Sequence, residues 1–298
     1  MYTAIAANKR YSVLLFVLFS VVAVGVSVWM SVVSSSPWPA VFILGFTAAY
    51  TWWQFRSAVG IVAKLAGCVE VSPGEEPELY RVVHNLAIRN GMPMPKVCVI
   101  NDAAANAIAI GMSPSDAVIA VTRGTLDLLT RSELEGVVAH EMAHIKNLDT
   151  RVKLTIFSLV GAFAALTAAC WSVASFIFSW SHNGKNPAIA IALVLTVVGA
   201  ILAVVAFLVG PLVKAALSRE REYLADASAF EMTRYADGLS SALAKMEDAG
   251  PAVRRSAIAT SSFYFLSPLK RGFWSRLLSS HPPTLNRIER LVLISRSF

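Results

Sequence analysis

Four long apolar runs that contain no charged residue constrain this chain more than any other feature. They span residues 11–33, 38–55, 154–180 and 188–213. A helix needs about 20 apolar residues to cross a bilayer, and each run is close to that length or longer. Charged residues make up only 15% of the chain, whereas a soluble domain carries about 25%. The sequence therefore predicts an α+β, mainly α-helical integral membrane protein with four transmembrane helices.

Basic residues predict the orientation of these helices. Lys9 and Arg10 precede the first run and Arg56 and Lys64 follow the second, whereas the turn between the two runs has no basic residue. Cytoplasmic segments are enriched in Lys and Arg, so we expect the N-terminus and both polar blocks to face the cytoplasm. The net charge of +7 is not gathered in a dense basic run, so no nucleic-acid partner is expected. We expect a multi-pass plasma (inner) membrane protein, with the lipid bilayer as its partner.

The polar block after the second run carries a metal-binding pattern, His140-Glu141-Met142-Ala143-His144. Residues four apart lie on one face of a helix, so both imidazoles can bind a single metal ion. Glu141 projects beside them, where a carboxylate can accept a proton from a water that the metal activates. The alternative is a surface helix with two unrelated histidines, but the chain has only five histidines. The pattern favours the zinc site of a hydrolase.

This polar block also contains the pattern of a small sheet. Residues 75–90 have helical periodicity, and Thr130 and Ser132 are both candidate N-caps of the metal-binding helix, each with Glu three residues later. The short β-type runs between them are 96–100, 105–110 and 117–122. We expect a small sheet that precedes the metal-binding helix.

A catalytic zinc ion takes three protein ligands, so a third ligand is needed outside this helix. The best candidate is Glu222, in a charged helix expected over residues 218–236. Asp226 lies on the same helical face and can accept a hydrogen bond from a ligating histidine. The alternative is a juxtamembrane helix whose carboxylates pair with Arg219 and Arg221. Both metal-binding motifs adjoin the third and fourth apolar runs, which would bring them together as antiparallel helices.

Several stretches together resemble the HtpX-type membrane zinc metallopeptidases, which are relatives of the prenyl-protein (CAAX) endopeptidases. These stretches are Val138–Asn147, Arg221–Asp226, Asn106-Ala-Ile-Ala and His281–Ile288. Their order and spacing, and the four-span layout, agree over nearly the whole chain. Met142 and Leu148 depart from the commoner residues at their positions, and neither needs to touch the metal.

The resemblance implies roles for particular residues. His140, His144 and Glu222 would bind one Zn2+ per chain, Glu141 would be the general base, and Asp226 would support a ligating histidine.

The resemblance also implies a substrate cleft. The strand at Asn106 would edge this cleft, where an extended substrate can add by main-chain pairing. Asn106 would contact the substrate or the oxyanion, or else only make a turn at the strand end. His281 would serve transition-state charge or cap the helix expected from Thr284, and Arg287 would brace carboxylates near the site.

The expected function is zinc-dependent endoproteolysis of misfolded or membrane-associated proteins at the cytoplasmic face, in membrane protein quality control alongside other such proteases. A zincin-like cytoplasmic domain would be split by the membrane segments. Its expected parts are a transmembrane hairpin at 1–56, the first metalloprotease part at 57–151, a second hairpin at 152–213 and the second metalloprotease part at 214–298.

Two alternatives stay open at this point. A CAAX endopeptidase would require lipidated C-terminal substrates, and that branch carries more membrane spans than the four expected here. A non-catalytic zinc-binding membrane protein, a scaffold or a transporter, would have no use for Glu141, and the apolar runs lack the ionisable residues typical of transport. Residues 254–276 are rich in Ser, aromatic and basic residues and give no clear prediction.

Overall fold

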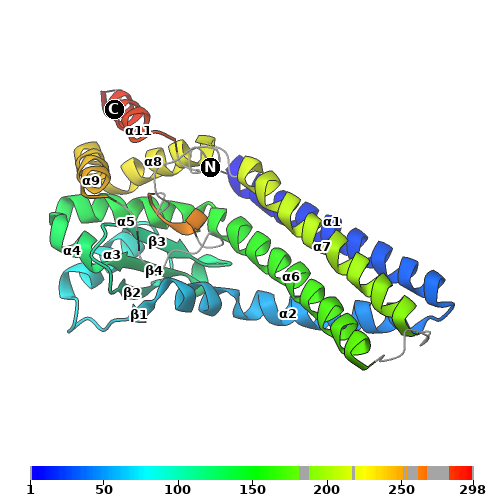
Figure 1. The fold of residues 1–298 in the computed structure, drawn as a ribbon. Coiled ribbons are helices and arrows are strands. Elements are labelled where there is room, and N and C mark those ends of the chain that lie inside the picture. The colour runs from blue at the N-terminus through cyan, green and yellow to red at the C-terminus, as the bar shows by residue number, and fades with distance from the viewer. Residues whose placement is uncertain are drawn as a thin grey trace. The chain divides into compact units, whose positions relative to one another are not determined.

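The structure, a computed structural model, describes residues 2–180, 188–216, 219–250, 253, 261–266 and 282–296 (Figure 1). These residues form two compact units. We call them the α/β unit, which contains Met1–Tyr11, Ala58–Leu154 and Lys214–Phe298, and the helical unit, which contains Ser12–Ser57 and Thr155–Val213. The α/β unit holds the sheet and both metal-binding motifs, so the chain leaves this unit and returns to it twice.

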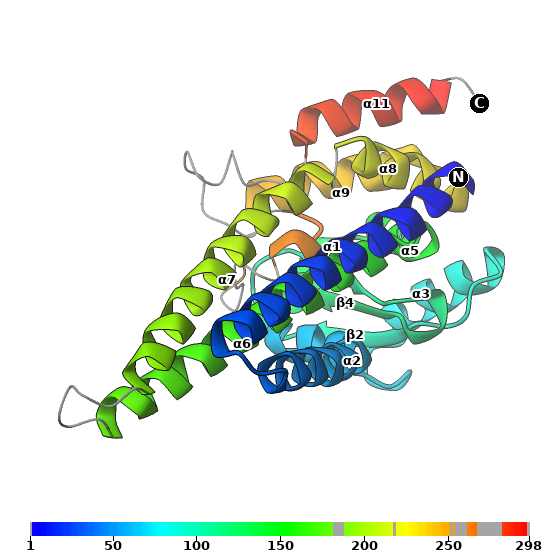
Figure 2. The same cartoon turned by 90° about the vertical axis from the view of Figure 1, so that its right-hand side faces the viewer.

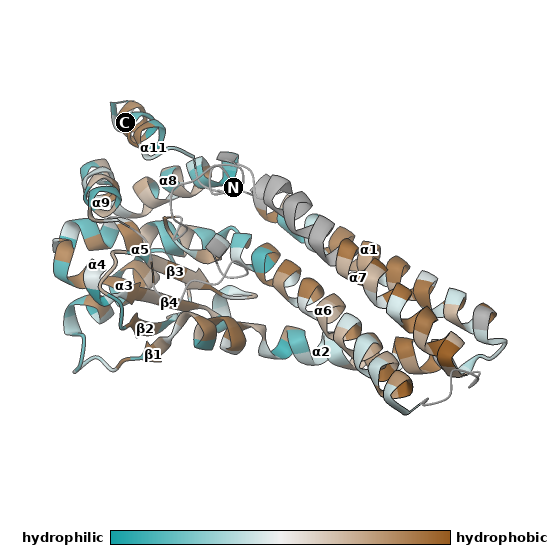
Figure 3. Cartoon of the chain, viewed as in Figure 1, coloured by the Kyte–Doolittle hydropathy of each residue, from teal (hydrophilic) through white to brown (hydrophobic). Residues whose placement is uncertain are grey.

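The helical unit consists of parts of the long apolar helices. They are α1 (Tyr2–Ser34), α2 (Trp38–Ala66), α6 (Asp149–Trp180) and α7 (Ala188–Ala216). In Figure 3 the colour of hydrophobic residues runs along much of α1, α6 and the part of α7 that is not grey. Two segments, Ile5–Val32 and Asp149–Trp180, are long and apolar enough to cross a membrane, and α7 adds a shorter apolar segment, Ala188–Val204, among the residues that were described.

Inside the helical unit, small residues let the helices pack closely. A Cβ atom on Gly161 of α6 would lie 2.6 Å from Nε2 of Gln54 on α2, so a side chain at this position would require the end of Gln54 to move. Nearby, the rings of Phe19 and Phe163 meet edge to face with their centroids 4.7 Å apart. Such small-residue contacts are typical of helices that pack in lipid, where no hydrophobic effect drives them together.

A mixed four-stranded sheet forms one layer of the α/β unit. Its strands are β1 (Cys68–Glu70), β2 (Lys96–Ile100), β3 (Ala107–Ile110) and β4 (Val118–Thr122), in the order β1-β2-β4-β3. Only β2 and β4 pair in parallel; the other pairs are antiparallel. The predicted small sheet is confirmed, and β1 is an addition to it, since three residues are too short to show a strand pattern. The strand at the edge next to the metal site is β3.

The helices of the α/β unit have bounds that differ slightly from the predicted ones. They are α3 (Pro77–Arg89), α4 (Arg123–Leu128), α5 (Arg131–Lys146), α8 (Arg219–Thr233), α9 (Ala236–Ala249) and α11 (Thr284–Arg296), of which α3, α4 and α5 pack against the sheet. The helix expected over 218–236 ends earlier, because Arg234 has a φ of 57° and α9 starts at Ala236. The central helix, α5, packs against α3, α8, α9 and the strand β3.

Two glycines allow α5 and α9 to pack closely against each other. A Cβ atom on Gly136 of α5 would lie 2.7 Å from the backbone nitrogen of Leu239, and one on Gly238 of α9 would lie 2.6 Å from the carbonyl oxygen of Ser132. Both are backbone atoms, which cannot move aside as the end of a side chain can. Because α5 carries two of the proposed metal ligands, this close crossing positions them.

The N-terminus of α5 is fixed by Glu133, which forms a capping box with Thr130. Its carboxylate accepts hydrogen bonds from the Thr130 backbone N–H (2.8 Å), from Ser241 and from Lys245 (2.9 Å). Burial alone would raise the pKa of Glu133, but these donors outweigh burial and lower the pKa to about 2. The cap therefore ties α5 to α9 while the carboxylate is ionised.

Replacing Glu133 with glutamine is expected to lower the free energy of unfolding by about 1–3 kcal/mol at pH 7, because buried donors lose a charged acceptor. The folded pKa lies below the unfolded value of about 4.3, so this stabilisation is present above that value and is lost as the pH falls towards 2. Denaturation of the detergent-solubilised protein, followed by circular dichroism, should show the two proteins converging in acid. Glu135→Gln, at an exposed ion pair with Arg89, is the control and should change little.

Candidate metal centre

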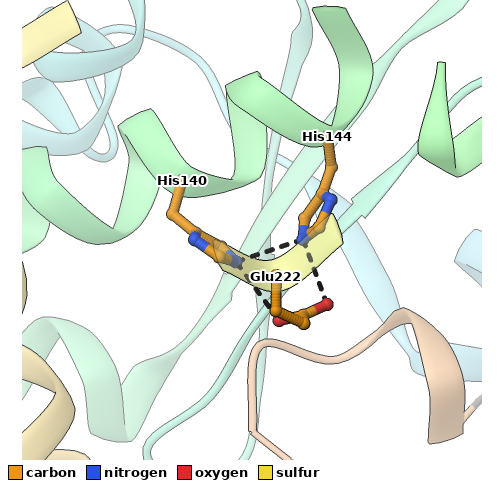
Figure 4. Close-up of side chains that lie close together, drawn as sticks. All are labelled: His140, His144 and Glu222. Atoms are coloured by element: carbon orange, nitrogen blue, oxygen red, sulfur yellow. Dashed lines mark hydrogen bonds and ion pairs between the residues drawn. The ribbon is translucent and has the colours of Figure 1, made fainter. Parts of the chain in front are cut away.

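Two helices bring three possible metal ligands together. His140 and His144 lie one turn apart on α5, and Glu222 faces them from the first turn of α8 (Figure 4). The two Nε2 atoms are 3.1 Å apart, and the Glu222 carboxylate oxygens lie 3.8 Å from Nε2 of His140 and 3.5 Å from Nε2 of His144. All three side chains are buried. The structure thus joins residues that the sequence places far apart.

These separations suit a tetrahedral divalent ion. Zinc binds nitrogen and oxygen at about 2.0–2.2 Å, so neighbouring ligand atoms around it lie about 3.3 Å apart. The observed separations of 3.1, 3.5 and 3.8 Å lie around that value. Two imidazole nitrogens and one carboxylate are also the donor set of many catalytic zinc sites, with the fourth position left for water or substrate. The residues therefore fit a catalytic metal ion.

A buried ion pair orients His140. Its Nδ1 lies 2.9 Å from Oδ1 of Asp226, and Arg287 donates to both oxygens of that carboxylate, at 2.9 Å from Nε and 2.6 Å from Nη2. Burial alone would raise the pKa of Asp226, but the Arg287 guanidinium outweighs burial and lowers the pKa to about 2. Because an ionised carboxylate can only accept, Nδ1 of His140 carries the proton and Nε2 keeps its lone pair for a metal.

The second histidine is oriented by Asp149, which the sequence reasoning missed. Oδ2 of Asp149 lies 2.9 Å from Nδ1 of His144. The carboxylate accepts a hydrogen bond from the Nδ1–H group, which leaves the lone pair of Nε2 free for a metal. Asp149 follows His144 by five residues and begins α6, not α5. Helical spacing therefore gives no cue to this contact; the only signal is an acidic residue just after the end of the metal-binding helix.

A strained residue turns the chain between these two helices. Leu148 has a φ of 61°, in the left-handed region that costs an ordinary residue about 1–2 kcal/mol. This position is one where the sequence departs from the residues commoner in the resembled family. The turn ends α5 and lets Asp149 reach back to His144.

Burial sets the protonation of the other groups at the site. It lowers the pKa of His140 to about 4, assisted by the charge of Arg287, so this imidazole is neutral and able to bind a metal near pH 7. Burial also lowers the pKa of His144, but the Asp149 carboxylate, together with Glu222, raises it by more. Glu141 is only 1% exposed, and burial raises its pKa to about 7. A carboxyl group with that pKa can both accept and donate a proton near neutral pH.

Residues 261–266 of the same chain lie along the edge of β3 that faces away from β4. The Phe265 N–H donates to the Ala107 carbonyl (2.8 Å), and Tyr264 forms a bridge with Ile108. The Asn106 side chain forms two hydrogen bonds with the backbone of Leu266. It donates to the carbonyl (3.0 Å) and accepts from the N–H (3.1 Å). The described structure thus places Asn106 against the chain itself, at the edge where the resemblance implies substrate.

Phe265 connects this segment to the metal site. Its ring meets the His140 imidazole edge to face at 5.0 Å, and the Arg287 guanidinium lies 5.0 Å from the same ring. Arg287 is fully buried and forms an ion pair with Asp226. His281 lies outside the described residues, as do residues 254–260 and 267–276 of the segment without a clear sequence prediction.

Comparison with known proteins agrees with this geometry. The family model of Peptidase family M48 matches residues 73–294. A protease HtpX homolog of Tropheryma whipplei (strain Twist) is 36% identical over 298 residues, covering 100% of both chains, and one of Dictyoglomus thermophilum is 40% identical over 250 residues, covering 84% of this chain and 79% of the relative. The crystal structure of S. mikatae Ste24p is a distant neighbour, with a TM-score of 0.48 and 18% identity over 98% of this chain and 67% of that one. The resemblance to HtpX-type peptidases is confirmed, and the chain belongs to peptidase family M48, as a membrane-bound metalloprotease.

Proposed function

We propose that this metalloprotease uses zinc to hydrolyse peptide bonds of misfolded or membrane-associated proteins at the cytoplasmic face of the membrane. The observation that supports this most strongly is the buried cluster of His140, His144 and Glu222 beside Glu141, in a chain that also carries helices of membrane-spanning length. Such proteolysis serves membrane protein quality control, and other quality-control proteases are its expected partners.

In the proposed reaction, each residue of the site has a distinct task. A bound zinc ion would supply Lewis acidity towards the scissile carbonyl and the attacking water. Glu141 accepts the proton of that water and later delivers it to the leaving amine, a double role that suits a carboxyl group with a pKa of about 7. Asp226 and Asp149 hold the protons on Nδ1 of His140 and His144, which keeps both Nε2 atoms available as ligands.

The edge of β3 is the proposed binding site for an extended substrate. Residues 261–266 already pair with this edge in antiparallel fashion, which supports its ability to hold an extended peptide. A substrate strand would displace this segment and take its hydrogen bonds with Ala107 and Asn106. The proposed role of His281 in stabilising transition-state charge stays a prediction.

We also propose that α1, α2, α6 and α7 all cross the membrane, with the N-terminus and the α/β unit in the cytoplasm. The basic residues that flank the apolar runs within α1 and α2 support this orientation. By length and hydropathy, α1 and α6 qualify as spans within the described residues. The apolar run of α2 is interrupted inside the helix by Gln54 and Arg56.

A chelator that cannot cross membranes tests the metal and the orientation together. In inverted membrane vesicles, which expose the cytoplasmic face, EDTA should abolish cleavage of a membrane-embedded reporter protein, and added zinc should restore it. In right-side-out vesicles the same chelator should leave cleavage intact, while membrane-permeant phenanthroline stops it in both. Cleavage that survives both chelators would overturn the metal dependence, and cleavage that EDTA stops only in right-side-out vesicles would overturn the orientation.

A further inference from the structure

The buried Asn8 near the start of α1 belongs to the α/β unit and contacts the turn behind the metal site. Its side chain is only 2% exposed, whereas the neighbouring Lys9 and Arg10 are exposed. Nδ2 of Asn8 donates to the carbonyl oxygen of Asn147 and to Oδ1 of Asp149, both at 2.8 Å. The two contacts join parts of the chain that are 139 and 141 residues apart. Figure 2 shows the first turns of α1 beside α8.

Asp149 is the link between Asn8 and the metal site. Oδ1 of its carboxylate accepts from Asn8, and Oδ2 lies 2.9 Å from Nδ1 of His144. Arg221 of α8 also donates to Oδ1, at 3.3 Å, and its guanidinium lies 5.5 Å from the ring of Tyr11 on α1. The first turns of α1 therefore contact both the carboxylate and its second donor.

We propose that Asn8 is a positioning residue of the metal centre, which fixes the Asp149 carboxylate so that His144 presents Nε2 to the metal. This inference rests on the metal site of the proposed function. The torsion that turns a carboxylate is broad, so a lone hydrogen bond from His144 would orient it weakly. The amide of Asn8 holds Oδ1 while the carbonyl of Asn147 holds the amide, which leaves Oδ2 directed at the imidazole.

A substitution of the same shape separates the donor of Asn8 from the volume of its side chain. An aspartate of the same shape could not donate, and it would place a second negative charge beside the first. Asn8→Asp therefore removes the hydrogen-bond donor to Asp149 with almost no change in side-chain volume.

The test measures metal binding by the full-length protein in detergent. Zinc affinity is obtained by competition with a chromophoric chelator, and the coordination geometry from the visible absorption of Co2+ bound in place of zinc. Asn8→Asp is expected to weaken zinc binding about tenfold and to change the Co2+ spectrum, as other changes behind metal ligands do. Asn8→Ala should have a smaller effect in the same direction, and Lys9→Ala, one residue along on the exposed face, should leave both readouts unchanged.

A double-mutant cycle separates positioning from simple support of the fold. If Asn8 acts through Asp149, then Asn8→Ala should change zinc affinity by less than about twofold in an Asp149→Ala background. Equal losses of zinc affinity in both backgrounds would overturn the positioning role of Asn8, and so would wild-type zinc affinity and a wild-type Co2+ spectrum in Asn8→Asp. Neither result would affect the proposed function. Failure of the wild-type protein to bind zinc would overturn the proposed function as well.

Discussion

Replacing Glu141 with glutamine is expected to abolish proteolysis while the metal stays bound. Glutamine keeps the size of the side chain, but it cannot accept the proton of the attacking water, and general-base catalysis of this kind contributes about 10²–10⁴-fold in rate. Glu141 is not one of the three clustered ligand candidates, so metal retention should not depend on it. Cleavage of a membrane-embedded reporter and zinc content by atomic absorption measure the two properties separately.

The matched control lies on the same helix. Glu135 is partly exposed and pairs with Arg89 at the surface, so Glu135→Gln should cleave the reporter at the wild-type rate. Undiminished cleavage by Glu141→Gln would remove Glu141 from the mechanism. Loss of zinc from that variant would instead assign the residue to metal binding.

The second large effect is expected from the buried ion pair behind His140. Arg287→Met should lower the free energy of unfolding by about 3–5 kcal/mol, because Asp226, 2% exposed, would be left as a buried charge without its partner. The thermal midpoint of the detergent-solubilised protein, with and without zinc, measures this loss. Without the charge of Arg287 the pKa of His140 should rise, so protons compete better with the metal for the imidazole, and we expect zinc affinity to fall together with stability.

Two further variants separate the charge effect from the loss of packing. Arg287→Met combined with Asp226→Asn removes both charges and should regain part of the lost stability. Arg290→Met, on the exposed side of the same helix, removes a guanidinium that lies over the Tyr223 ring and should cost little. A double variant no more stable than Arg287→Met would mean that the buried charge of Asp226 is not the cause.

The clustering of the candidate metal ligands could be predicted because their signal is local. His140, Glu141 and His144 share one stretch of helix, whose period alone places the two imidazoles on one face. Glu222 needed a second argument, namely that zinc requires another ligand and that two antiparallel helices would bring it near. In each case the inference depends on a periodic element that the sequence displays directly.

The supporting contacts could not be predicted, because they depend on irregular backbone and on distant parts of the chain. Asp149 reaches His144 only because Leu148 takes a left-handed conformation, which a sequence pattern does not specify for a leucine. Asn8 lies 141 residues from Asp149, in the short segment before the first apolar run, which carries no recognisable motif. The pairing of residues 261–266 with β3 likewise involves a segment without a recognisable strand pattern.

The order of the site residues along the chain has a consequence for biosynthesis. The two histidines and Glu141 are made first, the apolar helices α6 and α7 follow, and Glu222 comes only after them. Arg287 is made later still, 147 residues after His140. A chain emerging from the ribosome therefore holds the proposed general base and two of the proposed ligands, and it lacks the third until α6 and α7 have been synthesised. We expect this arrangement to keep the nascent protease inactive while it is next to the insertion machinery and to other unfolded membrane chains.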